Sequence, residues 1–319
     1  MIPIITIEGA TATGKTQLAL QIAEKLDAEI ISADSRQVYQ YLDIGTAKPS
    51  ASELAKVKHH LISIITPDQK YNAGLFSKQA LEICHKLRSQ NKIPIVCGGT
   101  GLYVKALLEG LFPADVHNHQ VRLDLEKELQ ANGLEQLYAE LANVDPFAAQ
   151  KINCRDKQRI LRALEVFRAS GLPISQHWKK QNTESKLFPF KIYLNEERQT
   201  LYKRINDRVE AMLKAGLLDE IKSVLAKGFS WSDPGFNTVG YKEFQPYFEG
   251  SADLSSCVVL AQQHTRNYAK RQFTWYRKCN FHLSEAYSSI NLDNVLLLVK
   301  KHREKISSGE CNGSYRSSL

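Results

Sequence analysis

No apolar run in the sequence approaches the roughly 20 residues that a membrane-spanning helix needs. The six cysteines form no Cys-x-x-Cys pair and are scattered through 319 residues, which is typical of free thiols in a reducing compartment. No secretory signal precedes the first motif, which begins at Gly9. These absences exclude a membrane protein and a disulfide-stabilised secreted domain, and we expect a cytoplasmic protein.

The composition is that of a folded globular protein, with 43% hydrophobic and 24% charged residues. Lys and Arg number 42 against 34 Asp and Glu, which leaves a net charge of +8. This excess favours a polyanionic partner such as a nucleic acid. Many proteins without such a partner are equally basic, so charge alone does not decide the function.

Short apolar runs alternate with amphipathic segments in the first part of the chain. Residues 2–7 and 29–33 are typical of buried strands, and residues 17–26 between them carry apolar side chains at helical spacing. Such a strand–helix–strand unit predicts a parallel sheet. Residues 94–97 predict another buried strand, and residues 190–194 predict one that returns to the sheet.

The character of the sequence changes after Pro113, where it becomes helical, charged and poor in β-branched runs. We therefore predict a sheet domain formed by residues 1–113 and 188–306, interrupted by a helical insertion at residues 114–187. The Ser- and Gly-rich tail at residues 307–319 is predicted to be disordered.

A phosphate-binding motif lies between the first predicted strand and the first predicted helix. The segment matches G-x-x-x-x-G-K-[ST], in which a curled glycine-containing backbone and a helix N-terminus point N–H groups at phosphate oxygens. Its Lys15 supplies a positive charge, and the Thr16 hydroxyl is a candidate ligand of Mg²⁺. The motif predicts an α/β, P-loop NTPase-like fold with a phosphate site at Gly9, Ala10, Thr11, Ala12, Thr13, Gly14, Lys15 and Thr16.

Two features of nucleotide hydrolases are missing. The strand at residues 94–97 ends in Gly98-Gly99 instead of an acid that would help hold Mg²⁺, and no Asn-Lys-x-Asp base signature is present. The acid that does follow a strand is Asp34, which the carboxyl edge of a parallel sheet would place near Lys15. Asp34 is also a good helix N-cap, and the residues alone leave both roles open.

Several segments in addition to the phosphate motif form an ordered set. They are residues 32–39, 42–49, 98–103, 158–166, 239–243 and 270–275. In this order they resemble the tRNA dimethylallyltransferase family. The resemblance implies transfer of a dimethylallyl group from dimethylallyl diphosphate to N6 of the adenosine at tRNA position 37, beside the anticodon, with release of diphosphate.

The resemblance assigns catalytic roles to three residues. Asp34 matches the family's general base, and Thr11 and Arg208 match residues that contact the diphosphate. An adenine amine is a poor nucleophile because its lone pair is delocalised, and a positioned base contributes a factor of about 10² to 10⁴. Mg²⁺, held by Thr16 and the diphosphate, is the implied cofactor.

The resemblance also implies a tRNA anticodon stem-loop as partner, and we expect a monomer with no stable protein partner. The matching tRNA contacts are Asp34, Ser35, Arg36, Gln37, Thr100, Arg122, Gln158, Arg159, Ile160, Leu161 and Arg162.

Two basic stretches are compatible with RNA binding independently of the resemblance. Residues 151–162 and 263–278 each contain five Lys or Arg, and the second is interleaved with aromatic residues. A solvated basic face with aromatic side chains in the core would give the same pattern. The residues alone therefore keep two rival functions open: a small-metabolite kinase with Asp34 as base, and a non-catalytic RNA-binding protein.

Overall fold

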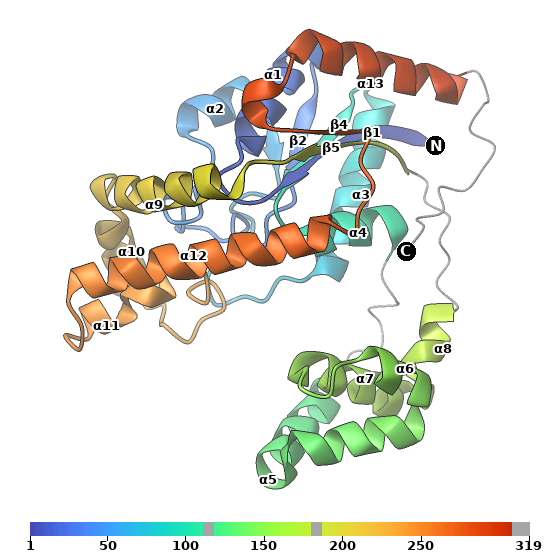
Figure 1. Ribbon diagram of the computed structural model, residues 1–319, viewed down its shortest axis with the longest axis vertical. Coiled ribbons are helices and arrows are strands. Elements are labelled where there is room, and N and C mark those ends of the chain that lie inside the picture. The colour runs from blue at the N-terminus through green and yellow to red at the C-terminus, as the bar shows by residue number, and fades with distance from the viewer. Residues whose placement is uncertain (111–117, 180–186, 308–319) are drawn as a thin grey trace. The chain divides into compact units, whose positions relative to one another are not determined.

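The computed structural model describes residues 1–110, 118–179 and 187–307. The chain forms two compact units, Met1–Glu109 with Glu184–Leu319, and Gly110–Thr183, which are drawn in Figure 1 and described separately below. None of the helices in the described ranges combines the length and the apolarity needed to cross a membrane.

Unit 1 is built on a parallel sheet with the strand order β3-β2-β4-β1-β5-β6. Its strands are β1 (Ile2–Gly9), β2 (Glu29–Ser32), β3 (His59–His60), β4 (Pro94–Gly98), β5 (Leu187–Leu194) and β6 (Leu283–Glu285). Every described strand pair is parallel, which confirms the predicted α/β fold. The two- and three-residue strands β3 and β6 were not predicted, because such short segments carry no periodicity.

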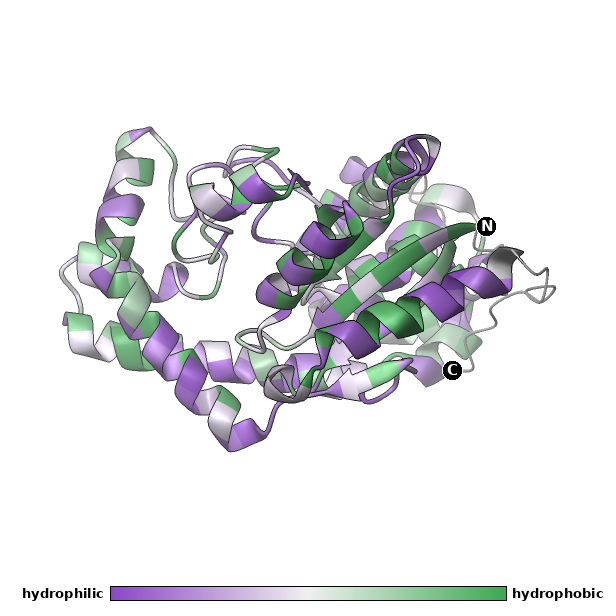
Figure 2. Cartoon of the chain, turned by 90° about the horizontal axis from the view of Figure 1, so that it is seen from above, coloured by the Kyte–Doolittle hydropathy of each residue, from purple (hydrophilic) through white to green (hydrophobic). Residues whose placement is uncertain are grey.

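Helices cover both faces of this sheet. In unit 1 they are α1 (Lys15–Leu26), α2 (Ala51–Lys56), α3 (Ala73–Ser89), α4 (Gly101–Glu109), α9 (Arg198–Lys214), α10 (Leu217–Ala226), α11 (Gln245–Phe248), α12 (Leu254–Tyr276) and α13 (Leu292–Ser307). Side chains alternate along a strand, so Ile5 packs with α1 and α13 while Ile4 packs with α3 and α4. Figure 2 shows the result: strands that are largely green, and helices that alternate between green and purple.

A further apolar cluster supports the loop that follows β2. Val38 and Leu42 of this loop are fully buried against Phe236 and Tyr241 and against side chains of α10 and α12. The helix α12, drawn in orange in Figure 1, packs against α9. The loop after Asp34 is therefore held by packing although it contains no long helix or strand.

The described part of unit 2 consists of helices α5 (His119–Val144), α6 (Pro146–Lys151), α7 (Lys157–Ser170) and α8 (Ile174–Lys179). Leu125, Leu141 and Leu164 are completely buried in its own core. The helix α5 is interrupted at Gly133, where φ is 80°, a left-handed conformation that favours glycine.

The structure corrects two predicted boundaries. Leu187, assigned above to the insertion, is the first residue of β5 and pairs with Ile2 of the central strand. Ser307, assigned to the tail, is the last residue of α13. The remainder of the predicted tail and the boundary at residue 113 lie outside the described residues.

Candidate active site

The phosphate motif forms the turn between β1 and α1, where the sequence predicts it. Gly14 precedes α1 with φ 91°, and a Cβ there would lie 2.9 Å from the Tyr287 ring, so glycine is required. The carbonyl of Ala10 accepts hydrogen bonds from Lys15 Nζ at 2.5 Å and from Thr13 Oγ1 at 2.8 Å. These bonds close the loop into a fixed conformation before any ligand binds.

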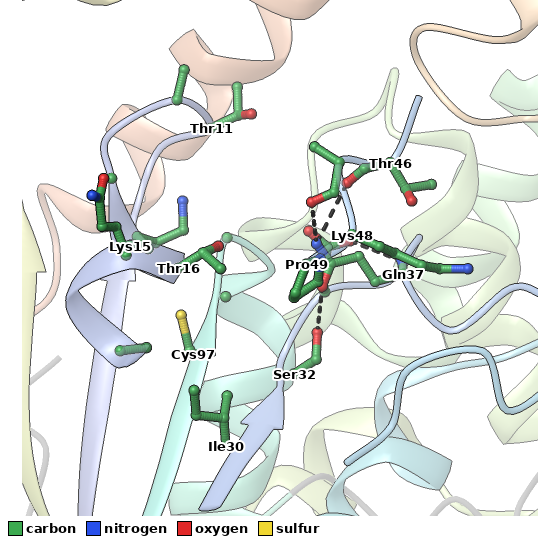
Figure 3. Close-up of a pocket in the computed structure, with 18 of the residues that line it drawn as sticks. Thr11, Lys15, Thr16, Ile30, Ser32, Gln37, Thr46, Lys48, Pro49 and Cys97 are labelled. Atoms are coloured by element: carbon green, nitrogen blue, oxygen red, sulfur yellow. Dashed lines mark hydrogen bonds between the residues drawn. The ribbon is translucent and has the colours of Figure 1, made fainter. Parts of the chain in front are cut away.

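A cavity of about 450 Å³ opens beside this loop. Lys15 and Thr16 lie on one side of it in Figure 3, Gln37 and Lys48 lie on the other, and Cys97 lies between them. Lys15 and Thr16 bring the N-terminus of α1 into its lining, where backbone N–H groups and the helix dipole favour an anion. The arrangement matches the predicted phosphate site.

Asp34 follows β2 and lines the same cavity. Its Oδ1 accepts hydrogen bonds from the backbone N–H groups of Arg36 at 2.8 Å and Gln37 at 3.4 Å. These bonds stabilise a turn, not a helix: the next helix, α2, begins at Ala51 and is capped by Ser50. The helix N-cap alternative for Asp34 is therefore wrong, and the carboxylate is oriented by its own turn.

Burial changes the titration of both cations near Asp34. It lowers the pKa of Lys15 to about 8, although the charge of Asp34 acts in the opposite direction. Burial also lowers the pKa of Arg208, again against the effect of Asp34. Both shifts mean that positive charge is costly here without an anion, so a diphosphate would be bound strongly.

A second cavity, of about 290 Å³, adjoins the first and is also lined by Asp34. Asp34 and Arg208 line both cavities, and the second is also lined by Arg36, Lys242 and Arg271. The two cavities also share Thr11, Thr46 and Tyr268, so ligands in the two cavities would lie next to each other beside Asp34. Such an arrangement suits a transfer between two substrates.

Four predicted tRNA contacts lie near this junction, and most of their polar groups are already used. The Ser35 N–H donates to Thr100 Oγ1 at 3.1 Å, and Arg36 donates to a backbone carbonyl at 3.2 Å. The Gln37 side chain accepts a bond from Ser32 Oγ at 2.9 Å and donates to the carbonyl of Ala47 at 3.1 Å. In this conformation Gln37 holds the loop, while Arg36 reaches the second cavity.

Comparison with known proteins identifies the family of this chain. The family model described as IPP transferase matches residues 37–279. The chain belongs to this family. A tRNA dimethylallyltransferase of Roseiflexus castenholzii is 43% identical over 279 residues, covering 87% of this chain and 90% of the relative. Another, of Geotalea uraniireducens, is 42% identical over 278 residues, with 87% and 90% covered.

Solved structures agree with this membership of the IPP transferase family. The full-length tRNA isopentenylpyrophosphate transferase of Bacillus halodurans has a TM-score of 0.71 at 32% identity, covering 97% of this chain and 100% of the other. A eukaryotic dimethylallyltransferase acting on tRNA has a TM-score of 0.83 at 27% identity, covering 97% and 80%. The resemblance and the P-loop NTPase-like fold inferred from the sequence are confirmed.

In unit 2 of this IPP transferase family member, two predicted tRNA contacts pair with one buried acid, and a third is bonded to one of them. Glu165, 2% exposed, pairs with Arg162 at 3.3 Å and with Arg122 at 3.8 Å. Arg122 also donates to Gln158 Oε1 at 3.1 Å and pairs with Glu126 at 2.9 Å. The sequence-distant helices α5 and α7 thus present these side chains together.

The other three predicted contacts of unit 2 differ from one another. Arg159 is 69% exposed at its side chain and pairs with Asp156 at 3.3 Å. Ile160 and Leu161 are completely buried in the core of unit 2. The prediction that these two contact tRNA is wrong for their side chains, because apolar residues between the polar positions of an amphipathic helix face its core.

The sequence analysis missed residues that α12 contributes to the cavities, above all Tyr268 and Gln272. Both lie in the basic stretch at residues 263–278, which the sequence analysis considered for its charge, its aromatic residues and its resemblance to the family, but not for a place in a cavity. Their spacing of four residues on one helix face was the signal. Arg271 is exposed, while Phe273 packs against the phosphate loop, an arrangement that either interpretation of this stretch allows.

Proposed function

We propose that the chain transfers a dimethylallyl group from dimethylallyl diphosphate to N6 of the adenosine at tRNA position 37 and releases diphosphate. The observation that carries this proposal is the meeting of two cavities at Asp34. The relatives at 42–43% identity are named tRNA dimethylallyltransferases, which supports the choice of donor and acceptor.

The donor diphosphate would occupy the cavity beside the phosphate loop. Lys15 and the N-terminus of α1 face it from one side. Arg208 lies at the junction, where a guanidinium can bind two phosphate oxygens at once. As the allylic C–O bond breaks, negative charge grows on the leaving diphosphate, and these fixed donors stabilise that charge most in the transition state.

The residues present fit a Mg²⁺ ion bound through the diphosphate. Within the described ranges no group of three His, Cys, Asp or Glu is placed to hold a metal. Mg²⁺ usually keeps several waters and takes only one or two protein ligands beside substrate phosphates, and the Thr16 hydroxyl in the cavity is such a ligand. When bound, Mg²⁺ would neutralise charge on the leaving group.

Asp34 would act on the acceptor. The adenine must leave the base stack to reach the junction, and Arg36 and Arg271 line the cavity that would receive it. The N6 lone pair forms the new C–N bond as the C–O bond breaks, and the amine proton passes to the Asp34 carboxylate. The two hydrogen bonds to Oδ1 hold this carboxylate in place.

Unit 2 would offer further contacts to the anticodon stem-loop. The exposed guanidinium of Arg159 and the cluster of Arg122, Gln158 and Arg162 would pair with its phosphates. We also propose a monomer that acts in the cytoplasm, where tRNA is available. Light scattering during gel filtration would test the oligomeric state, since a stable dimer would double the apparent mass.

A transfer assay tests the proposal. Purified protein is incubated with Mg²⁺, dimethylallyl diphosphate and an anticodon stem-loop RNA of about 17 nucleotides, which includes a stem and a seven-base loop. The mass of the RNA is then measured by mass spectrometry. One dimethylallyl increment is expected with adenosine at position 37, and none with uridine there. Consumption of ATP with a hydroxyl acceptor, and no increment, would favour the kinase and refute the proposal.

A further inference from the structure

We infer that Gln272 of α12 is a positioning residue that fixes the distance between the phosphate loop and the segment bearing Asp34. The inference rests on the proposed function, because it concerns the alignment of the diphosphate with the base. Gln272 is 5% exposed and comes from a helix far along the chain. It lies outside the phosphate motif and outside the predicted tRNA contacts.

The side-chain amide of Gln272 joins two parts of the site. Its Oε1 accepts the backbone N–H of Thr11 at 2.9 Å, and its Nε2 donates to the carbonyl of Gly99 at 2.8 Å. A primary amide has one acceptor and one donor end, so only glutamine among residues of this length satisfies both partners. The bridge spans from the phosphate loop to the end of β4.

The glycines after β4 fit the face of α12 that carries Gln272. A Cβ at Gly99 would lie 2.4 Å from Nε2 of Gln272, and a Cβ at Gly101 would lie 2.1 Å from the indole nitrogen of Trp275. Both contacts are shorter than non-bonded atoms tolerate. The glycine-rich segment is therefore shaped by the approach of α12, which brings Gln272 within hydrogen-bond distance of the backbone.

The bridge continues from Gly99 to the residues around Asp34. Thr100 follows Gly99 in the chain, and its backbone N–H donates to the carbonyl of Ala33 at 3.2 Å. Thr100 Oγ1 accepts the N–H of Ser35 at 3.1 Å, next to Asp34. A continuous set of bonds thus runs from the loop that would bind diphosphate to the turn that orients the base.

Loss of this bridge would act on alignment more than on binding. Lys15, Thr16 and Arg208 do not depend on Gln272 for their place in the cavity lining, so they would still bind diphosphate. The next residue after Thr11 is Ala12, whose φ of 63° is unfavourable for a residue with a side chain. Without the bond from the Thr11 N–H to Gln272, this turn could relax to a more favourable conformation. A misplacement of about 1 Å can slow a reaction about a hundredfold.

The test compares three variants with the wild type in single-turnover transfer at saturating donor and stem-loop. Gln272→Met keeps the length and removes both bonds, and Gln272→Asn keeps the amide but is one methylene too short to bridge. Gln263→Met is the matched control, since Gln263 is an exposed glutamine of the same helix. The dissociation constant of isopentyl diphosphate, a saturated analogue that cannot transfer, is measured in parallel.

We expect both Gln272 variants to slow transfer about tenfold to a hundredfold, because that factor corresponds to the loss of one or two buried hydrogen bonds at the site. The affinity for the analogue should change less than about threefold. The control should match the wild type. Transfer within twofold of wild type in Gln272→Asn, or an equal loss of analogue affinity, would overturn the inference. Absence of transfer by the wild type itself would refute the proposed function instead.

Discussion

The lowered pKa of Lys15 predicts that donor affinity falls as the pH rises. In the free protein burial lowers this pKa to about 8, so Lys15 begins to lose its proton above that pH. A bound diphosphate brings negative charge to the amine and raises the pKa back toward its ordinary value. The complex therefore holds more protons than the free protein above pH 8, and binding weakens with rising pH.

The size of the effect follows from the two pKa values. With about 8 in the free protein and about 10.4, the ordinary lysine value, in the complex, the dissociation constant rises about tenfold between pH 7 and pH 9. Three neighbouring groups stay protonated in this range: burial raises the pKa of Tyr268 and of Cys97 to about 12, and Arg208 remains protonated. Burial also lowers the pKa of Lys48 in the same cavity, so the comparison with a Lys15 variant isolates the part that belongs to Lys15.

Isothermal titration with isopentyl diphosphate at pH 7, 8 and 9 would measure this dependence. The ligand is about nine-tenths ionised at pH 7 and almost fully ionised at pH 8 and 9, because the second ionisation of a phosphate lies near pH 6; this small change would strengthen binding as the pH rises and so cannot mimic the predicted fall. Lys15→Arg is the matched control, since a guanidinium keeps its proton and its profile should be flat. A wild-type affinity that is constant or rises between pH 7 and pH 9, or an equal fall in the arginine variant, would refute the reasoning.

Three other predictions concern packing, RNA binding and the metal. Gly45→Ala should lower the melting temperature, with a loss of about 1–3 kcal/mol, because its Cβ would lie 2.4 Å from the Tyr241 ring; an unchanged melt would contradict this packing. Arg159→Ala should lower the slope of log affinity against log salt for the stem-loop by about 1 without changing the melt, whereas Arg168→Ala should do the reverse, because Arg168 bridges two carboxylates of α5 at 2.7 Å. EDTA should abolish transfer and Mg²⁺ should restore it, with Thr16→Ala needing a higher Mg²⁺ concentration; transfer that survives EDTA would exclude the metal.

Local sequence patterns predicted the strands that lie deepest and the loop that carries the phosphate motif. The segments 2–7 and 94–97 are almost entirely apolar because both faces of a parallel sheet are covered. The phosphate motif fixes its own conformation through bonds between near neighbours such as Thr13 and Ala10. Such features depend on residues close together in the sequence, which is why the pattern alone was sufficient.

Long-range contacts explain what the sequence did not predict. Gln272 reaches Thr11 across 261 residues, and only the packing of α12 brings them together. The strand pairing of Leu187 with Ile2 likewise depends on the sheet and not on local composition. The burial of Ile160 could be read from helical spacing, whereas the family resemblance marked its whole segment as RNA-contacting.

The central claim is that Asp34 is the base for transfer to an adenine amine. The most direct test is the single-turnover rate of Asp34→Asn, with binding of isopentyl diphosphate and of the stem-loop measured on the same sample. Asparagine can still accept the hydrogen bonds that Arg36 and Gln37 donate to Oδ1, so the turn is kept while the base is lost. We predict a rate lowered by a factor of about 10² to 10⁴ with both ligands still bound, and a rate within a few-fold of wild type would contradict the claim.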